Sequence, residues 1–154
     1  MGIRITGLPA AQFSHLFTLS DTELTRRSAM RVIADRDRSL PCRVSLTDAR
    51  AGDEVILVNY EHLPVATPYR SRYAIFVREG EDRYDSTEEV PDQLLRRTLS
   101  LRAFSDRHLL AGCAVVEGKD LQTSAGSVLE NPRVSYLHVH FAAAGCYAAR
   151  VDRA

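Results

Sequence analysis

The chain has 154 residues, of which 45% are hydrophobic and 26% are charged, and this balance is typical of a soluble globular domain rather than of a disordered chain. Lys and Arg together number 20, as do Asp and Glu, so no net charge favours binding to nucleic acid or to an anionic membrane. No apolar run approaches the roughly 20 residues that a membrane span needs, and no signal peptide follows Met1. We therefore expect a single cytoplasmic domain over residues 1–154, without a nucleic-acid or membrane partner.

The cysteine content fits the same cellular setting. Cys42, Cys113 and Cys146 are odd in number and far apart in the chain, which is unlike the pattern of a disulfide-bonded fold. A cation such as Arg43 lowers the pKa of a neighbouring thiol, but on a strand the side chains of Cys42 and Arg43 would face opposite ways. We expect Cys42 to be a buried, unreactive thiol, and Cys113 and Cys146 to belong to the core.

Apolar periodicity predicts strands and short helices in the first half of the chain. The expected strands cover residues 2–6, 29–35, 42–46, 54–58 and 73–78, and an expected helix covers residues 10–17. Ser20 followed by Glu23 is a capping-box pattern, which predicts the start of a second helical turn. Residues 54–58 are apolar on both faces, so they should form a central strand that is covered on both sides.

The second half of the chain begins with a charged segment, residues 80–89, which we expect to be mobile. Pro91 at a first helical position, with Leu94 and Leu95 behind it, predicts a short helix. The other expected elements are a hairpin of strands over 99–104 and 110–116, a helix over 119–129, and strands over 134–141 and 146–151. About eight strands with roughly three or four short helices predict an α+β fold, a single domain with a curved, mostly antiparallel sheet.

A polar segment, residues 59–72, separates two of the most apolar strands and is the first candidate site. It carries an amide, phenols, a carboxylate, an imidazole and guanidinium groups: Asn59, Tyr60, Glu61, His62, Tyr69, Arg70 and Arg72. Loops that rigid strands hold in place often carry binding and catalytic groups. We therefore expect this loop to contribute to a binding site.

Within that loop, Arg70 is the best single candidate for holding an anion, because a guanidinium grips a carboxylate or phosphate with two parallel hydrogen bonds. A structural ion pair with Glu61 is an equally good interpretation. His62 next to Glu61 resembles a general base with a carboxylate neighbour, although adjacent side chains on an extended loop point apart. Tyr69 suits packing, with its hydroxyl bound to a partner.

The second candidate stretch is the strand around His138 and His140. On a strand, Tyr136, His138 and His140 share one face, and the apolar residues between them share the other. The apolar face should be the core side, so the polar face either meets solvent or lines a cavity. Two imidazoles at this spacing could bind one metal with His62 or Glu61 as third ligand, but two ligands are a weak signal, and we assign no metal and no cofactor.

Several motifs in order give the chain a resemblance to a known family. They are Pro41-Cys42-Arg43, Asn59-Tyr60-Glu61-His62, Pro68-Tyr69-Arg70, Ile75-Phe76-Val77-Arg78, Ser100-Leu101-Arg102-Ala103, Tyr136-Leu137-His138-Val139-His140 and Gly145-Cys146. From Ile3 to Arg153 the chain resembles a family of short bacterial proteins catalogued only as a domain of unknown function. The resemblance implies a one-domain bacterial protein and brings no activity, cofactor or partner. Phe141 stands where the family pattern has a polar Asn, which argues against a polar role at that position.

These observations lead to one hypothesis and two alternatives. The leading hypothesis is a pocket between the 59–72 loop and the Tyr136 strand face, which binds a small anionic metabolite and could act on it by acid–base chemistry. Arg70 would hold the anion and His62 or His138 would handle a proton; the other expected ligand-binding residues are Asn59, Glu61, Tyr69, Tyr136 and His140. The alternatives are a non-catalytic binding module or homodimer whose interface is the aromatic and Arg-rich surface, and a metal-dependent enzyme that uses His138 and His140.

Overall fold

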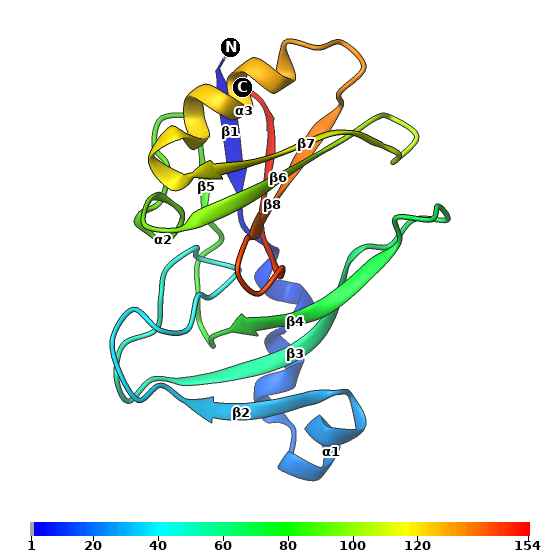
Figure 1. The fold of residues 1–154 in the computed structure, drawn as a ribbon. Coiled ribbons are helices and arrows are strands. Elements are labelled where there is room, and N and C mark those ends of the chain that lie inside the picture. The colour runs from blue at the N-terminus through cyan, green and yellow to red at the C-terminus, as the bar shows by residue number, and fades with distance from the viewer. Residues whose placement is uncertain (1) are drawn as a thin grey trace.

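A computed structural model describes residues 2–154, and its strands form two sheets stacked one above the other (Figure 1). All strand pairs within the two sheets are antiparallel. The strands are β1 (Ile3–Thr6), β2 (Ala29–Ile33), β3 (Glu54–Leu63), β4 (Ser71–Val77), β5 (Asp85–Ser86), β6 (Thr98–Phe104), β7 (Leu110–Glu117), β8 (Tyr136–Phe141) and β9 (Tyr147–Arg153). The expected α+β fold with antiparallel sheets and few helices is therefore confirmed, with the strands divided between two sheets.

The helices are short. They are the 3-10 helices η1 (Ala10–Gln12), η2 (Ser14–Thr18) and η3 (Gly118–Asp120), and the α-helices α1 (Asp21–Arg26), α2 (Asp92–Leu95) and α3 (Leu121–Leu129). The expected capping box opens α1, since Ser20 Oγ accepts from the Glu23 amide and the Glu23 carboxylate accepts from the Ser20 amide, at 3.2 and 3.0 Å. No helix among residues 2–154 has the length and apolar character to cross a membrane.

The larger sheet has six strands in the order β5-β1-β9-β8-β6-β7. Its apolar face packs against α3, which buries Leu121, Ala125 and Leu129 over Leu137 and Val139 of β8. The apolar residues of β6, β8 and β9 thus form the main core, as their periodicity in the sequence predicts. The 85–86 pair of the charged segment is β5, which pairs with β1 at the edge of this sheet.

The smaller sheet has three strands in the order β2-β3-β4. β3 is its central strand, as expected, and its apolar side packs with the N-terminal helices in a second core around Leu24, Ile56 and Ile75. The two sheets meet where Leu63 of β3 packs against Phe104 of β6. The layer between the sheets, called the seam below, is where the polar face of β8 lies.

Three local predictions are wrong. The expected strand over 42–46 forms only isolated bridges, Pro41↔Asp48 and Cys42↔Phe76, because Leu46 adopts a positive φ of 53° and the chain turns there. The expected 59–72 loop is extended up to Leu63 in β3, so only the middle of that segment is a loop. Cys113 is an exposed thiol on the outermost strand, not a core residue.

The loop that replaces the expected strand is held on three sides by backbone hydrogen bonds. Leu8 donates to the Arg43 carbonyl at 2.8 Å, Tyr84 donates to the Val44 carbonyl at 2.9 Å, and Arg43 itself donates to the Phe76 carbonyl at 3.0 Å. Gly7 makes this approach possible, because a Cβ at that position would lie 2.1 Å from the Val44 carbonyl oxygen. The loop is therefore a fixed platform for the side chain of Arg43.

Candidate functional site

The two candidate stretches meet in the seam through His62. Its ring, on β3, lies with its centroid 6.2 Å from that of His138 and 5.1 Å from that of His140, both on β8. The Tyr147 ring of β9 stacks on the His62 ring at a centroid distance of 5.5 Å and an interplanar angle of 16°. The three imidazoles, called the histidine cluster below, therefore come together from two sheets, as the sequence hypothesis requires of His62, His138 and His140.

Two of the three rings of the histidine cluster are covered by protein, and His62 is half-buried. His138 is 5% exposed and His140 is 1% exposed, and every residue of β8 is buried. The polar face of β8 thus neither meets solvent nor lines any of the cavities found among residues 2–154. It packs against β3 and the ring of Tyr147 instead, which the period of a single strand does not reveal.

Burial keeps all three imidazoles neutral at pH 7. Burial, followed by the proximity of the other two rings, lowers the pKa of His138 to about 2. Burial lowers the pKa of His140 to about 3, against the opposing effect of its hydrogen bond with the Gly145 carbonyl. Burial and the nearby charge of Arg102 lower the pKa of His62 to about 4. The cluster is therefore a set of uncharged donors and acceptors, not a positive site.

The ring nitrogens differ in their hydrogen bonds. His140 donates from Nδ1 to the Gly145 carbonyl oxygen at 2.9 Å, which leaves its Nε2 as the acceptor of the neutral ring. Nδ1 of His62 and Nδ1 of His138 are buried without a hydrogen-bond partner among residues 2–154. A buried polar atom in this state costs about 1–3 kcal/mol, so each of these two nitrogens is an unmet hydrogen-bonding group.

A metal centre of the kind suggested for His138 and His140 needs a third protein ligand close to both rings. Among residues 2–154, no group of three or more His, Cys, Asp or Glu side chains is arranged to hold a metal ion. Glu61, the alternative third ligand, pairs with arginine instead.

Tyr69 and Tyr136 pack at one end of the seam. The Tyr136 hydroxyl lies 2.6 Å from Nδ1 of His108, and its ring stacks on Phe104 at 5.6 Å. The Tyr69 ring meets the Phe104 ring edge-on at 6.2 Å, and the Arg150 guanidinium lies 4.2 Å from the Tyr136 centroid. Both tyrosines thus serve the packing that the sequence suggested for Tyr69.

Arg70 is engaged on the surface of the β3–β4 hairpin. Its Nη2 lies 3.1 Å from the Glu61 carboxylate, and Arg72 lies 3.9 Å from the same carboxylate. Arg72 also donates a hydrogen bond to the Asn59 side chain. Of the two interpretations of Arg70, the structural pair with Glu61 is the one present. Asn59, Glu61 and Arg70 therefore form a surface network outside the histidine cluster.

Beside the cluster lies a pocket that the sequence analysis missed. It has a volume of about 500 Å³ and opens between the two sheets; we call it the inter-sheet pocket. Its lining residues are Ser39, Pro41, Arg43, Leu57, Tyr73, Ala74, Phe76, Arg97, Thr98, Phe141, Ala143, Ala144 and Cys146. Most of the wall is apolar or aromatic, and the two arginines are its only charged groups. This composition is typical of a small-molecule site.

Arg43 is the most unusual residue of the pocket. It is 1% exposed, donates from Nε to the Tyr147 carbonyl oxygen at 2.7 Å, and also donates to the Pro41 carbonyl oxygen. Among residues 2–154, no carboxylate lies within ion-pair distance of it, and burial lowers the pKa of its guanidinium. A buried cation that has carbonyl oxygens, the Cys146 thiol and an aromatic ring around it but no carboxylate is incompletely compensated.

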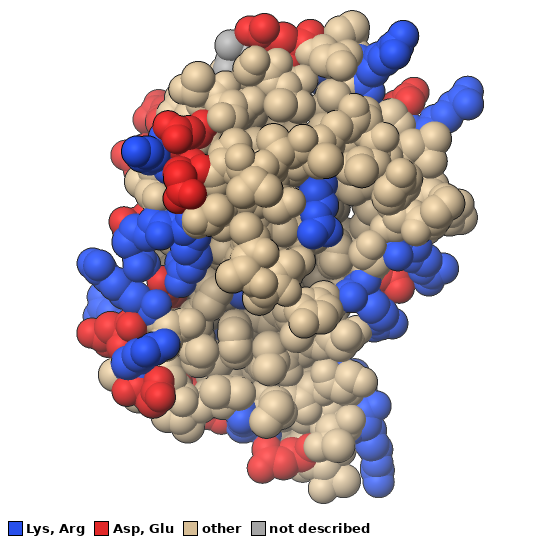
Figure 2. Space-filling view, viewed as in Figure 1, with Lys and Arg blue, Asp and Glu red and all other residues tan. Residues whose placement is uncertain are grey.

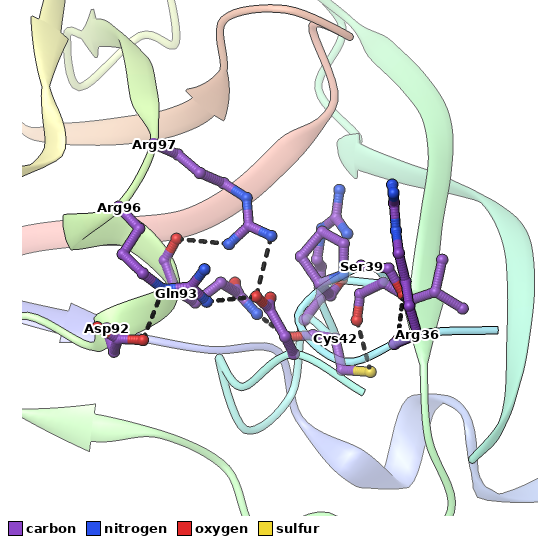
Figure 3. Close-up of polar contacts among 11 residues, drawn as sticks. Arg36, Ser39, Cys42, Asp92, Gln93, Arg96 and Arg97 are labelled. Atoms are coloured by element: carbon purple, nitrogen blue, oxygen red, sulfur yellow. Dashed lines mark hydrogen bonds and ion pairs between the residues drawn. The ribbon is translucent and has the colours of Figure 1, made fainter. Parts of the chain in front are cut away.

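Arg97 approaches the pocket from the start of β6 (Figure 3). It donates to the Gln93 carbonyl oxygen at 2.8 Å and to the Asp48 carboxylate at 3.0 Å. Gln93, itself buried, donates to the Cys42 carbonyl oxygen at 3.2 Å. The guanidinium carbons of Arg43 and Arg97 lie 4.9 and 5.2 Å from the Phe141 ring centroid. Phe141 is thus the aromatic contact of both cations.

The segment 145–147 connects the pocket with the histidine cluster. Cys146 lines the pocket, the Gly145 carbonyl accepts from His140, and the Tyr147 carbonyl accepts from Arg43. The Tyr147 ring then contacts the cluster. Arg43 and Cys146 lie in two of the motifs that carry the family resemblance, and that was the one sequence signal that could have identified the pocket.

The comparisons with known proteins agree with the resemblance. Neither the curated proteins nor the solved structures gave a match. The model of a family described as "Protein of unknown function (DUF1203)" matches residues 39–153, which include the histidine cluster and every residue of the inter-sheet pocket. Since the match covers most of the chain, this protein belongs to the DUF1203 family of proteins of unknown function.

Proposed function

We propose that the protein binds a small organic anion in the inter-sheet pocket, with Arg43 as the group that holds the negative charge. The supporting observation is the buried Arg43 guanidinium, which has no carboxylate partner among residues 2–154 and lines a pocket of about 500 Å³. The sequence analysis gave this role to Arg70, which lies on the surface of the β3–β4 hairpin and pairs with Glu61. The expected ligand is still a small anion, but the residue that binds its charge is Arg43 in place of Arg70.

Electrostatics favours an anion at this position. Removing a guanidinium from water costs several kcal/mol, and two carbonyl dipoles offset only part of that cost. A carboxylate or phosphate in the pocket would supply the missing charge at low dielectric, where such pairs are strongest. Arg97 shares its charge with Asp48 and would act as the second, weaker cation.

The walls of the pocket indicate the rest of the ligand. Leu57, Phe76 and Phe141 are apolar, and Ala143 and Ala144 leave room beside them. A ligand that only carried charge would leave these surfaces wet, whereas an apolar group on the ligand buries them. We therefore propose a small organic acid with an apolar body as the ligand class.

Catalysis is a second, separate part of the proposal. His62 and His138 are neutral, and each has a buried Nδ1 without a partner among residues 2–154, so each ring could donate or accept a hydrogen bond there. Their low pKa values make both rings weak bases at pH 7, so an acid–base role needs a bound ligand or a rearrangement that raises them. Gly145 to Tyr147 stand between these rings and the pocket. Binding without turnover would identify a non-catalytic binding protein, and turnover that is lost in His62→Gln or His138→Gln would identify an enzyme.

The cellular setting is also a proposal. Cys42, Cys113 and Cys146 are free thiols, which suits a reducing compartment such as the bacterial cytoplasm. Measuring the redox state of the three thiols in freshly lysed cells tests this setting.

Binding can be tested by a thermal-shift screen with a panel of small carboxylic acids and phosphate monoesters. The key variant is Ala144→Trp, because Ala144 lines the pocket and is exposed, so an indole there fills the pocket without disturbing the core. The control is Ala51→Trp, the same change at an exposed turn outside the pocket. We expect a hit that stabilises the wild type and Ala51→Trp but not Ala144→Trp. A hit that stabilises all three equally, or a panel without hits, contradicts the proposal.

A further inference from the structure

The outermost strand of the larger sheet, β7, is exposed along its length and carries no charge before its last residue. Residues 110–115 are all exposed, and Val115 is 71% exposed. The sequence Leu109–Val116 is uninterrupted by a charged or polar side chain. In Figure 2, the part of the surface over β6 and β7 carries few charged side chains, which gather along the flanks instead. This apolar stretch is therefore open to a partner.

The backbone of β7 is open as well. β7 pairs only with β6, so its other edge has no strand beside it among residues 2–154. Proteins usually protect such an edge with a charge, a proline or a very short strand. The other three edge strands follow this rule, since β5 has two residues with Asp85, β2 carries Arg31 and β4 carries Arg72. β7 has eight residues and no proline, and its only charge is Glu117 at its last position.

We propose that β7 pairs with β7 of a second copy of this chain, antiparallel and about a twofold axis, which joins the two six-stranded sheets into one. A strand edge is complemented by another strand, and a twofold pair requires that the strand complement itself. The small residues Ala111, Gly112 and Ala114 allow close approach, and no like charges face each other along the pair.

The charges beyond the apolar stretch favour the antiparallel direction. Arg107 precedes the stretch in the turn between β6 and β7, and has no ion pair among residues 2–154; Glu117 ends the strand. Antiparallel pairing brings the Glu117 end of one copy to the Arg107 end of the other. A parallel arrangement would place like ends together, so the twofold pairing is electrostatically preferred.

The side of β7 that faces α3 offers room for the partner strand. A cavity of about 260 Å³ lies there, lined by Ala111 and Ala114 of β7, by Val128 of α3 and by core residues of the sheet. The side chains of an added strand would cover this cavity and the exposed Val115. No residue of β7 lines the inter-sheet pocket, so this inference does not depend on the proposed ligand. It also places the dimer interface on β7 and not on the aromatic and Arg-rich surface that the sequence suggested.

The test compares the oligomeric state of two matched variants with that of the wild type, in reducing buffer, by sedimentation velocity up to millimolar protein. Val115→Lys puts a charge on β7 at a solvent-exposed position. Ile33→Lys makes the same change on β2, where Ile33 is 61% exposed. We expect a dimer for the wild type and Ile33→Lys, and association at least tenfold weaker for Val115→Lys. A wild type that stays monomeric, or a Val115→Lys variant that dimerises as tightly, overturns the proposal.

A covalent probe checks the orientation. Cys113 lies near the middle of β7 and is exposed, whereas Cys42 and Cys146 are buried. In the antiparallel pair the two Cys113 side chains lie near the axis, within the span a disulfide can bridge. Copper(II)–phenanthroline would take two electrons from the two thiols and release two protons as the bond forms. We expect a covalent dimer for the wild type and none for Cys113→Ser; a wild type without crosslinks overturns the twofold arrangement.

Discussion

Arg43 and Tyr147 are joined by a hydrogen bond of 2.7 Å from the buried guanidinium Nε to the backbone carbonyl oxygen of the tyrosine. The ring of the same tyrosine stacks on His62, so a single residue contacts the cation of the pocket and the cluster of neutral imidazoles. Arg43 lies in the loop before β3 of the smaller sheet, and Tyr147 is the first residue of β9 in the larger sheet. Their contact therefore links the seam with the pocket.

The first prediction concerns the stability that Arg43 contributes. Arg43→Met keeps the length of the side chain but leaves the carbonyls of Tyr147 and Pro41 without their donors. We expect the free energy of unfolding to fall by about 1–3 kcal/mol, because unpaired buried carbonyls are costly but a buried charge is removed. Urea denaturation measures this. An increase in the free energy of unfolding would contradict this prediction, because it would mean that the buried guanidinium destabilises the folded protein.

The second prediction concerns pH. The pKa values of His62, His138 and His140 in the folded protein, about 4, 2 and 3, lie below the ordinary value of 6.5. The unfolded chain then binds more protons than the folded one below pH 6.5, so the stabilisation from the neutral rings is complete above that pH. It is lost as pH falls toward the folded-state values, by about 1.4 kcal/mol per pH unit for each buried ring and by less for the partly exposed His62.

Urea denaturation between pH 4 and pH 8 measures this slope. We expect His138→Gln to reduce the pH dependence of the free energy of unfolding, and His15→Gln, at an exposed position outside the cluster, to leave it unchanged. Equal slopes for the wild type and His138→Gln would show that the cluster is not the source of the pH dependence.

The third prediction concerns thiol reactivity. Burial, followed by the charge of Glu81, raises the pKa of Cys42 to about 12, so its thiolate is scarce at neutral pH. In the Val115→Lys variant, which we expect to be monomeric, iodoacetamide should alkylate Cys113 first and Cys42 only after unfolding. Peptide mass spectrometry over a time course measures the order. Rapid labelling of Cys42 in the folded protein would disprove the inert role that both sequence and structure give it.

The fourth prediction concerns the platform of Arg43. A methyl group at Gly7 would meet the Val44 carbonyl oxygen at 2.1 Å, and both are backbone positions that cannot swing away. We expect Gly7→Ala to destabilise the protein by about 2 kcal/mol or more. Gly112→Ala is the matched control, since the nearest atom to its added methyl group is 4.0 Å away. Equal stabilities for the two variants would mean that the loop over Gly7 moves freely.

Local patterns predicted much of the fold. The capping box at Ser20, the hairpin of β6 and β7, and the alternation in β8 each depend on neighbours in the sequence, so their physics is visible there. The division of the strands into two sheets depends on pairings between distant segments, and single-strand periodicity carries no signal for these. The second sheet therefore could not be predicted from the sequence. For the same reason, the sequence did not show that β3 of that sheet packs over His138 and buries it.

The candidate site divides in the same way. His62 and His138 lie close together, as the hypothesis requires. The sequence could indicate this because an HxH motif on a strand and a polar segment after an apolar strand both contain polar side chains that must be buried or bound to a ligand. The sequence indicated Arg70 because a guanidinium at the entrance of a strand can hold an anion, and in the structure this side chain lies on the hairpin surface and pairs with Glu61, nine residues earlier. The sequence did not indicate Arg43 as a ligand-binding residue. The alternation of residues 42–46 predicted a strand with Arg43 on the face opposite Cys42, and that strand does not form.

The most direct measurement is isothermal titration calorimetry with one ligand, the organic acid that stabilises the protein most in the screen. This ligand is titrated into the wild type, Arg43→Met and Arg70→Met. The two variants lose the same charge and gain the same side chain, one in the pocket and one on the surface. We predict that Arg43→Met weakens binding by about tenfold or more while Arg70→Met leaves the dissociation constant unchanged. Unchanged binding in Arg43→Met, or a loss confined to Arg70→Met, would contradict the account.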